Sequence, residues 1–289
     1  MWRPADSGVL PAVRGYLARR EWACCALSSR ILVWGAPGCP VPGGGRLFAW
    51  IRDSGGAAIP PPATGLFLTT SSGGLYPALA DSPPERDEEL LALADVKTNR
   101  LSACIGLAED VRRIEAAARV ASADGNDYFL MVLDSPKLGC GLEPPFAGLA
   151  AFTPDLSDVN AVFPLQAAYE KEEVLVPMHR YDPRATRSGL AAALDGQEML
   201  CARLDGRIVA KAQTNARGVG WDQLGGIYVE PGLRGRGIGT WLVATLCLRI
   251  LGQGRSLTHF VKKKNAAAIR SYRKIGFRFR ESYRISYYS

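Results

Sequence analysis

The chain has 289 residues, of which 47% are hydrophobic and 22% are charged, and its net charge is +7. These values are typical of a folded protein with one large or two ordinary domains, and they exclude a fibrous or wholly disordered chain. The most apolar run, Ile238–Leu248, is too short to cross a bilayer, and arginines interrupt the apolar stretches near the start. We therefore expect no membrane association and no signal peptide.

Cysteine and histidine usage points to a cytoplasmic protein without a metal site. The seven cysteines are odd in number, scattered and free of any C-x-x-C pair, which favours reduced thiols. Only two histidines, His179 and His259, are available as imidazole ligands.

The first 145 residues are expected to form an α/β domain of unknown role. Apolar positions between residues 9 and 28 recur with helical spacing, and Ser82–Glu89 is Pro-rich and acidic, which is typical of an exposed loop. A second helix is expected over residues 111–121, followed by an Asp124-Gly125 turn. The expected strands are Ile31–Trp34, Leu47–Arg52, Leu66–Thr70, Leu101–Gly106 and Tyr128–Leu133. We find no motif that carries chemistry in this half, which could be a degenerate copy of the second.

A linker is expected over Gly139–Pro145, so that the second domain spans residues 150–289. Its first elements are a strand, Leu149–Phe152, and helices over Asp155–Val174 and Pro183–Leu194. The Asp205-Gly206 pair between two apolar runs predicts a hairpin of residues 198–204 and 207–215.

A strand, a glycine-rich turn and a helix follow one another after Leu224. Leu224–Val229 reads as a strand that Pro231 ends, Arg234–Gly239 is rich in glycine, and Ile238–Leu248 is uncharged and suits a buried helix closed by Gly252. Such a turn presents the unpaired N–H groups of a helix N-terminus to a phosphate, although a tight structural turn would look similar. The turn has neither the Gly-Lys-Ser/Thr ending of a Walker loop nor the spacing and downstream acid of a Rossmann fingerprint.

A second block lies downstream of the strand Leu257–Val261. Asn265 is a good helix N-cap, and Ala268 and Tyr272 are four residues apart on one helical face that Gly276 closes. From Phe277 onward apolar and polar residues alternate, which predicts a final strand.

These two blocks resemble the GNAT superfamily of N-acetyltransferases. The family's acyl-CoA loop, Arg/Gln-x-x-Gly-x-Gly/Ala, is matched by Arg234, Gly237 and Gly239. Its Asn-x-x-Ala-x-x-x-Tyr-x-x-x-Gly-Phe block is matched at every position by Asn265, Ala268, Tyr272, Gly276 and Phe277. The firm resemblance covers residues 225–287, and the order of the elements extends it back to about Phe152.

The resemblance implies an α/β fold, in detail an α+β mixed sheet whose two central parallel strands splay apart around the cofactor. It implies that acetyl-CoA is the acyl donor and that a primary amine attacks the thioester directly, with Tyr272 as the general acid. It also implies the following cofactor-binding residues: Ile227, Tyr228, Val229, Arg234, Gly235, Arg236, Gly237, Ile238, Gly239, Thr240, Asn265 and Ala268.

No sequence pattern identifies the general base or the acceptor substrate. Glu230, Asp222 and Glu198 are candidate bases, each more typical of a surface or turn acid. Glu170, Glu172 and Glu173 could line a cationic acceptor site, although a solvated helix face is the plainer reading. The acceptor could be a small molecule or a protein, and a homodimer is compatible with the sequence.

The charge is unevenly distributed along the chain. Residues 231–289 carry 13 lysines and arginines and one acid, Glu281, which gives this segment +12 and leaves −5 for the rest. This asymmetry fits an anionic partner, which could be nucleic acid, a membrane surface or a phosphorylated cofactor, and it equally fits a solvated basic face. Coenzyme A is polyanionic, and its phosphates would account for the basic residues without nucleic acid. Two alternatives to an enzyme remain: a non-catalytic CoA-binding regulator and a nucleic-acid-binding module.

Overall fold

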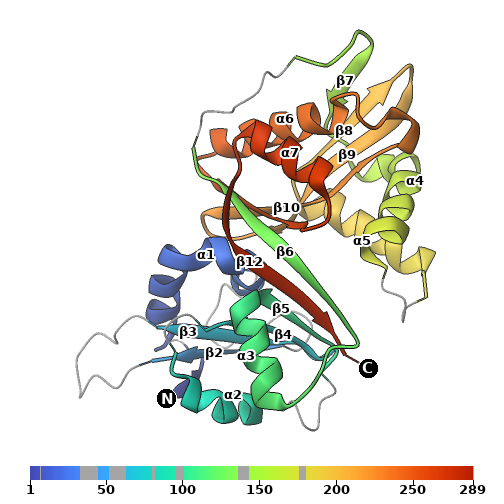
Figure 1. Ribbon diagram of the computed structural model, residues 1–289. Helices are drawn as coiled ribbons and strands as arrows, with labels where there is room; N and C mark the ends of the chain where they lie inside the picture. The colour runs from blue at the N-terminus through green and yellow to red at the C-terminus, as the bar shows by residue number, and fades with distance from the viewer. Residues whose placement is uncertain are drawn as a thin grey trace. The chain divides into compact units, whose positions relative to one another are not determined.

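The computed structural model describes residues 1–6, 8–32, 45–51, 63–79, 82–94, 101–135, 143–175 and 180–288. Contacts within the chain define two compact units (Figure 1). Unit 1 comprises Met1–Leu130, Gly218–Gly220 and Arg280–Ser289, and unit 2 comprises Met131–Arg217 and Trp221–Phe279. The domain limits expected from the sequence, 1–145 and 150–289, stay a prediction.

Unit 1 is a mixed sheet with helices on both faces. Its strands, in spatial order, are β1 (Trp2–Pro4), β2 (Arg46–Trp50), β3 (Gly65–Thr69), β4 (Gly74–Ala78), β5 (Ala103–Leu107) and β12 (Arg278–Tyr287). Its helices are α1 (Leu10–Leu32), the 3₁₀ turn η1 (Pro84–Arg86), α2 (Asp87–Leu93) and α3 (Ala108–Ala118). All neighbouring strands are antiparallel except β4 and β5, which are parallel.

The central strand β3 is buried on both faces, which explains its continuous apolar sequence. Leu66 and Leu68 pack against α1, whereas Phe67, one residue out of phase, packs with residues of α2 and α3 such as Leu90 and Val111. The period of two along a strand therefore divides the core of unit 1 into two layers.

Unit 2 has the same plan. Its strand order is β6 (Asp124–Leu133, of which only residues 131–133 belong to this unit), β11 (Ser256–Lys262), β10 (Trp221–Val229), β9 (Arg207–Arg217), β8 (Met199–Leu204) and β7 (Leu149–Phe152). Its helical segments are η2 (Leu156–Asp158), α4 (Val159–Tyr169), η3 (Glu170–Val174), α5 (Pro183–Gly196), η4 (Pro231–Leu233), α6 (Ile238–Gly252) and α7 (Ala266–Ile275). As in unit 1, a run of antiparallel strands meets one parallel pair, here β10 and β11.

The helices of unit 2 follow their sequence signals. A core of Val162, Leu190, Met199 and Cys201 joins α4 and α5 to β8. Helix α6 is buried on most of its surface, in keeping with its uncharged sequence.

Several local expectations are wrong in detail. Residues 31–32, expected in a strand, end α1, and residues 33–34 lie outside the described residues. The Asp124-Gly125 pair lies inside β6, and Asp87, expected in an exposed loop, is buried where α2 begins. Gly252 is the last residue of α6, and the left-handed glycine is Gly254, with φ 72°.

Residues 139–142 of the expected linker Gly139–Pro145 lie outside the described residues. Strands β1 and β4 were not anticipated. The described part of the chain contains no helix long and apolar enough to span a bilayer. It also contains no cluster of metal-ligating side chains, and its five cysteines are buried and form no disulfide.

Candidate active site

Two parallel strands of unit 2 separate where the site begins. The pairing of β10 with β11 ends at Leu224 and His259. Immediately beyond this point β10 bulges, because Gly226 and Ile227 lie together opposite Ala212 of β9. The strands are thus freed from each other at the place where the sequence predicts a cofactor between them.

The glycine-rich turn forms the start of α6. Gly235 and Gly237 have φ of 76° and 85°, a left-handed conformation that side chains with a β-carbon disfavour. Gly237 is the N-cap and provides no side-chain acceptor for the first N–H groups of α6. These N–H groups have no partner within the helix and carry the positive end of its dipole, so the turn suits a phosphate.

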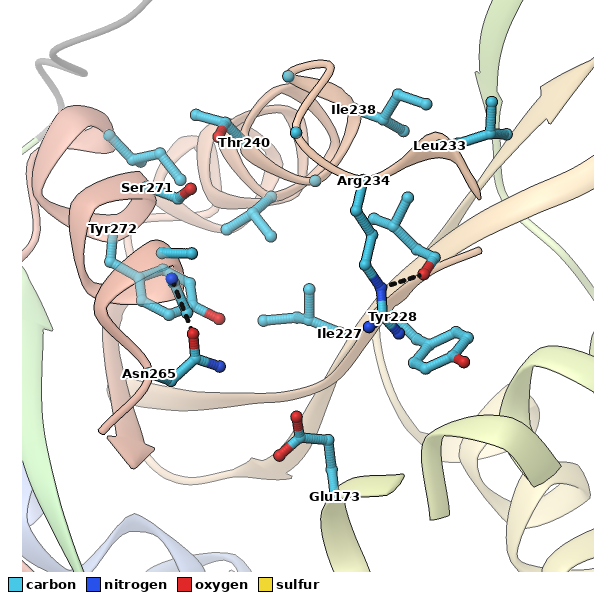
Figure 2. Close-up of a pocket in the computed structure, with 18 of the residues that line it drawn as sticks. Glu173, Ile227, Tyr228, Leu233, Arg234, Ile238, Thr240, Asn265, Ser271 and Tyr272 are labelled. Atoms are coloured by element: carbon cyan, nitrogen blue, oxygen red, sulfur yellow. Dashed lines mark hydrogen bonds between the residues drawn. The ribbon is translucent and has the colours of Figure 1, made fainter. Parts of the chain in front are cut away.

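A pocket of about 610 Å³ opens between the turn, the end of β10 and the first turns of α7 (Figure 2). This volume lies within the range of small-molecule and cofactor sites. Of the thirteen residues predicted to bind the cofactor or catalyse, twelve line it: Ile227, Tyr228, Val229, Arg234, Gly235, Gly237, Ile238, Gly239, Thr240, Asn265, Ala268 and Tyr272. The exception is Arg236, which is not among the lining residues.

Tyr272 and Asn265 lie on one side of this pocket. The side chain of Asn265 accepts a hydrogen bond of 3.0 Å from the Ala268 N–H, so its predicted N-cap role is confirmed. Figure 2 shows the Tyr272 hydroxyl directed into the cavity. Burial, aided by the neighbouring Tyr169, raises the pKa of Tyr272 well above its ordinary value, so the phenol keeps its proton at neutral pH.

His259 supports the ring of Tyr272, with the two ring centroids 4.3 Å apart. Its Nδ1 lies 3.0 Å from the Leu224 carbonyl, which can only accept, so Nδ1 carries the proton. Burial lowers the pKa of His259 to about 4, and the ring is therefore neutral. Sequence reasoning had considered this residue only as a metal ligand.

Arg234 contacts the acidic segment η3 in this structure. Its two terminal nitrogens donate to the two carboxylate oxygens of Glu172, each at 2.8 Å, and its Nε donates to the Val229 carbonyl at 3.0 Å. The Tyr228 hydroxyl donates to the same carboxylate at 3.2 Å. The hydrogen bonds from Arg234 hold the pKa of Glu172 below its ordinary value.

Glu173 lies on the pocket wall opposite the glycine-rich turn, and its carboxylate points into the cavity (Figure 2). Lys262, at the end of β11, donates to the carboxylate at 2.8 Å and to the Glu173 carbonyl at 2.9 Å. Glu172 and Glu173 therefore belong to the pocket, and the expectation of a merely solvated helix face was wrong for them.

None of the three candidate general bases lines the pocket. Asp222 is fully buried between Arg217 and Arg255, at 3.3 and 2.6 Å. Glu198 lies 3.5 Å from Arg217, and Glu230 pairs with an exposed arginine at 3.1 Å. Asp222 is the buried member of an ion-pair cluster, which explains its position better than proton transfer does.

The corresponding place in unit 1 is occupied by its own side chains. The Leu79 N–H, just after β4, donates to Asp110 of α3 at 3.2 Å. Burial raises the pKa of Asp110 to about 6. Helix α2 begins with Asp87 and two glutamates, and Arg113 donates to both oxygens of Asp87 at 2.6 and 2.5 Å. An acidic helix start that is already paired with an arginine does not suit a phosphate.

Comparison with known proteins agrees with this geometry. Residues 160–277 match the sequence model described as the Acetyltransferase (GNAT) family. A search of curated proteins gives no match to the chain.

Solved structures share the fold over nearly the whole chain. An X-ray structure of a Drosophila protein has a TM-score of 0.67 at 14% identity, covering 99% of this chain and 98% of that one. A GCN5-related N-acetyltransferase from Sphaerobacter thermophilus has a TM-score of 0.58 at 16% identity, with 99% and 94% covered. A tandem GNAT protein from the clavulanic acid biosynthesis pathway has a TM-score of 0.57 at 16% identity, with 99% and 97% covered. At these identities the likeness is one of fold.

Proposed function

Because residues 160–277 match the sequence model of the Acetyltransferase (GNAT) family, we propose that this protein transfers the acetyl group of acetyl-CoA to a primary amine. One observation carries the proposal: a single pocket gathers twelve of the thirteen residues that the sequence singles out. These residues come from β10, the glycine-rich turn, α6 and α7, which only the fold brings together.

The cofactor would be held mainly by backbone groups. The N–H groups of residues 235–240 would bind the pyrophosphate, since glycine allows close approach and α6 contributes its positive end. The gap between β10 and β11 would take the pantetheine arm, with Asn265 at its side. When bound, acetyl-CoA supplies the activated acetyl thioester.

Backbone groups, Tyr272 and water would each carry out one part of the reaction. Backbone N–H groups at the bulge of β10 would stabilise negative charge on the acyl oxygen, an effect that is often the largest in catalysis. Tyr272 holds a proton at its hydroxyl and would deliver it to the leaving sulfur. None of the three acids proposed as bases lines the pocket, and the two acids that do, Glu172 and Glu173, are paired with Arg234 and Lys262, so water would remove the proton of the attacking amine.

The experiment that tests the cofactor site is calorimetric titration of CoA-free protein with acetyl-CoA. We expect saturable binding that Gly237→Trp abolishes, because residue 237 has a left-handed backbone and borders the pocket. Gly189→Trp is the matched control, since this glycine lies exposed on α5, outside the pocket, with open space around its β-carbon position.

Three results distinguish the alternatives. Binding with turnover of a primary amine supports the enzyme. Binding without turnover on any amine would favour a CoA-binding regulator. Absence of acetyl-CoA binding by folded protein, together with salt-dependent binding of nucleic acid, would favour the nucleic-acid module.

A further inference from the structure

Lys211 of β9 is buried directly beneath the bulge of β10. Its side chain has no solvent exposure, which is rare for lysine unless the ammonium is paired. The Nζ atom donates to the Gly226 carbonyl at 2.7 Å and to the Gln213 side chain at 2.9 Å. A potentially charged group therefore contacts the backbone at the point where β10 leaves β11.

The shape of the bulge depends on this contact. Gly226 has φ 58°, and a β-carbon there would come within 2.7 Å of Gln213 and 2.9 Å of the Lys211 Nζ. The lysine thus packs against a backbone that only glycine can provide. Its loss would remove the hydrogen-bond donor from the Gly226 carbonyl, and a buried carbonyl without a donor is costly.

Lys211 is also close to the proposed chemistry. The residues that follow Gly226, Ile227–Val229, line the pocket. On its other side, the Lys211 Nζ lies 5.0 Å from the centre of the Tyr169 ring. Tyr169 in turn contributes to the raised pKa of Tyr272, the proposed acid. Lys211 therefore contacts both the backbone that precedes the pocket-lining residues of β10 and an aromatic ring that influences Tyr272.

We propose that Lys211 is a positioning residue of the acetyl-transfer site, which holds the Gly226–Ile227 bulge in shape and places a positive charge beside the thioester carbonyl. This inference rests on the function proposed above.

The charge on Lys211 changes within the neutral range. Burial lowers its pKa to about 7, and the neighbouring carboxylate of Glu170 of η3 limits the decrease. The other groups that face it are Tyr169 of α4 and Gln213 of its own strand. The Cys201 thiol is neutral, because burial raises its pKa to about 12. Lys211 is therefore cationic below pH 7, and its polarising effect on the carbonyl fades as the pH rises through 7.

Carbon-13 NMR of acetyl-CoA labelled at the acetyl carbonyl tests this directly, because the chemical shift of the carbonyl reports its polarisation without any acceptor. We expect the resonance of the bound ligand to titrate with a midpoint near pH 7, after correction for free acetyl-CoA over the same range. Neither His259, with a pKa of about 4, nor Tyr272, whose pKa is raised, titrates in this interval.

Two variants separate charge from hydrogen bonding. Lys211→Gln keeps a donor without a charge, so it should bind acetyl-CoA much as wild type does but show no titration. Lys211→Met removes both, and should lose the titration and about tenfold or more in affinity. Lys171→Met, which changes an exposed lysine on η3, should titrate like wild type.

A pH-independent carbonyl resonance in wild-type protein that binds acetyl-CoA would overturn this inference and leave the proposed function standing. Unchanged titration in Lys211→Met would also overturn it. Absence of acetyl-CoA binding by wild-type protein would overturn both. The wild-type titration decides the question even where a variant fails to fold.

Discussion

Replacing Tyr272 with phenylalanine removes one hydroxyl from the pocket and little else. The ring is buried and packs against His259 and Phe277, with centroid distances of 4.3 and 5.8 Å, and phenylalanine can keep both contacts. The hydroxyl makes no hydrogen bond to another described residue, so the free energy of unfolding should change by no more than about 1 kcal/mol.

The effect on catalysis should be far larger. A positioned general acid contributes roughly 10²- to 10⁴-fold to the rate. This factor corresponds to about 3–5 kcal/mol of activation free energy. The affinity for acetyl-CoA should stay near the wild-type value, because phenylalanine preserves the pocket wall and the hydroxyl acts on the leaving sulfur.

The assay is release of the CoA thiol, followed with a chromogenic disulfide in the presence of a primary amine that wild-type protein acetylates. Calorimetry supplies the dissociation constant, and chemical denaturation supplies the stability. Tyr181→Phe is the control, because it removes a buried hydroxyl that has no hydrogen-bond partner among the described residues and that lies outside the pocket. Wild-type turnover by folded Tyr272→Phe would refute the assignment of Tyr272 as the acid.

The remaining predictions concern stability and stoichiometry. Asp222→Ala should lower the free energy of unfolding in urea by about 3 kcal/mol, because it leaves Arg217 and Arg255 without their buried partner; a change below about 1 kcal/mol would contradict this. The pKa of His259 is about 4 in the folded protein, below its unfolded value, so protonation of this residue favours unfolding. Its protonation should therefore lower the free energy of unfolding by about 3 kcal/mol as the pH falls from 6.5 to 4. Asp110, with a raised pKa of about 6, contributes the opposite slope, so the readout is the difference between wild type and His259→Asn, and equal pH profiles would exclude the effect. Calorimetry should give one acetyl-CoA per chain, because among the described residues of unit 1 the helix that follows β4 begins with acids, of which Asp87 is already paired with Arg113; a stoichiometry of two would disprove this.

The sequence alone determined those parts of the site that depend on neighbours along the chain. The turn at Gly237 and the N-cap at Asn265 follow from local backbone chemistry, which is why both appear in the structure as expected. The periodicities of α6 and β8 are likewise local, and their bounds lie within a few residues of the expected ones. Tyr272 could be proposed as the general acid because the motif that resembles the GNAT family runs without interruption from Asn265 to Phe277.

Residues whose role depends on other strands could not be found this way. Lys211 stands in an ordinary strand pattern, and nothing nearby in the sequence indicates that β10 bulges over it. Glu172 and Glu173 look like solvated acids until Arg234 and Lys262 come beside them from distant elements.

The same limit applied to strand pairing. The alternation after Phe277 predicted a strand, but the backbone hydrogen bonds that place β12 beside β5, with Tyr283 opposite Leu107, form between segments far apart in the chain. A strand's period shows which residues share a face, whereas its partner is chosen by burial of that face in the folded core. The sequence therefore determined the helix cap at Asn265, the glycine turn and the periods of the strands, and tertiary packing decided the bulge, the buried lysine and the pairing of the last strand.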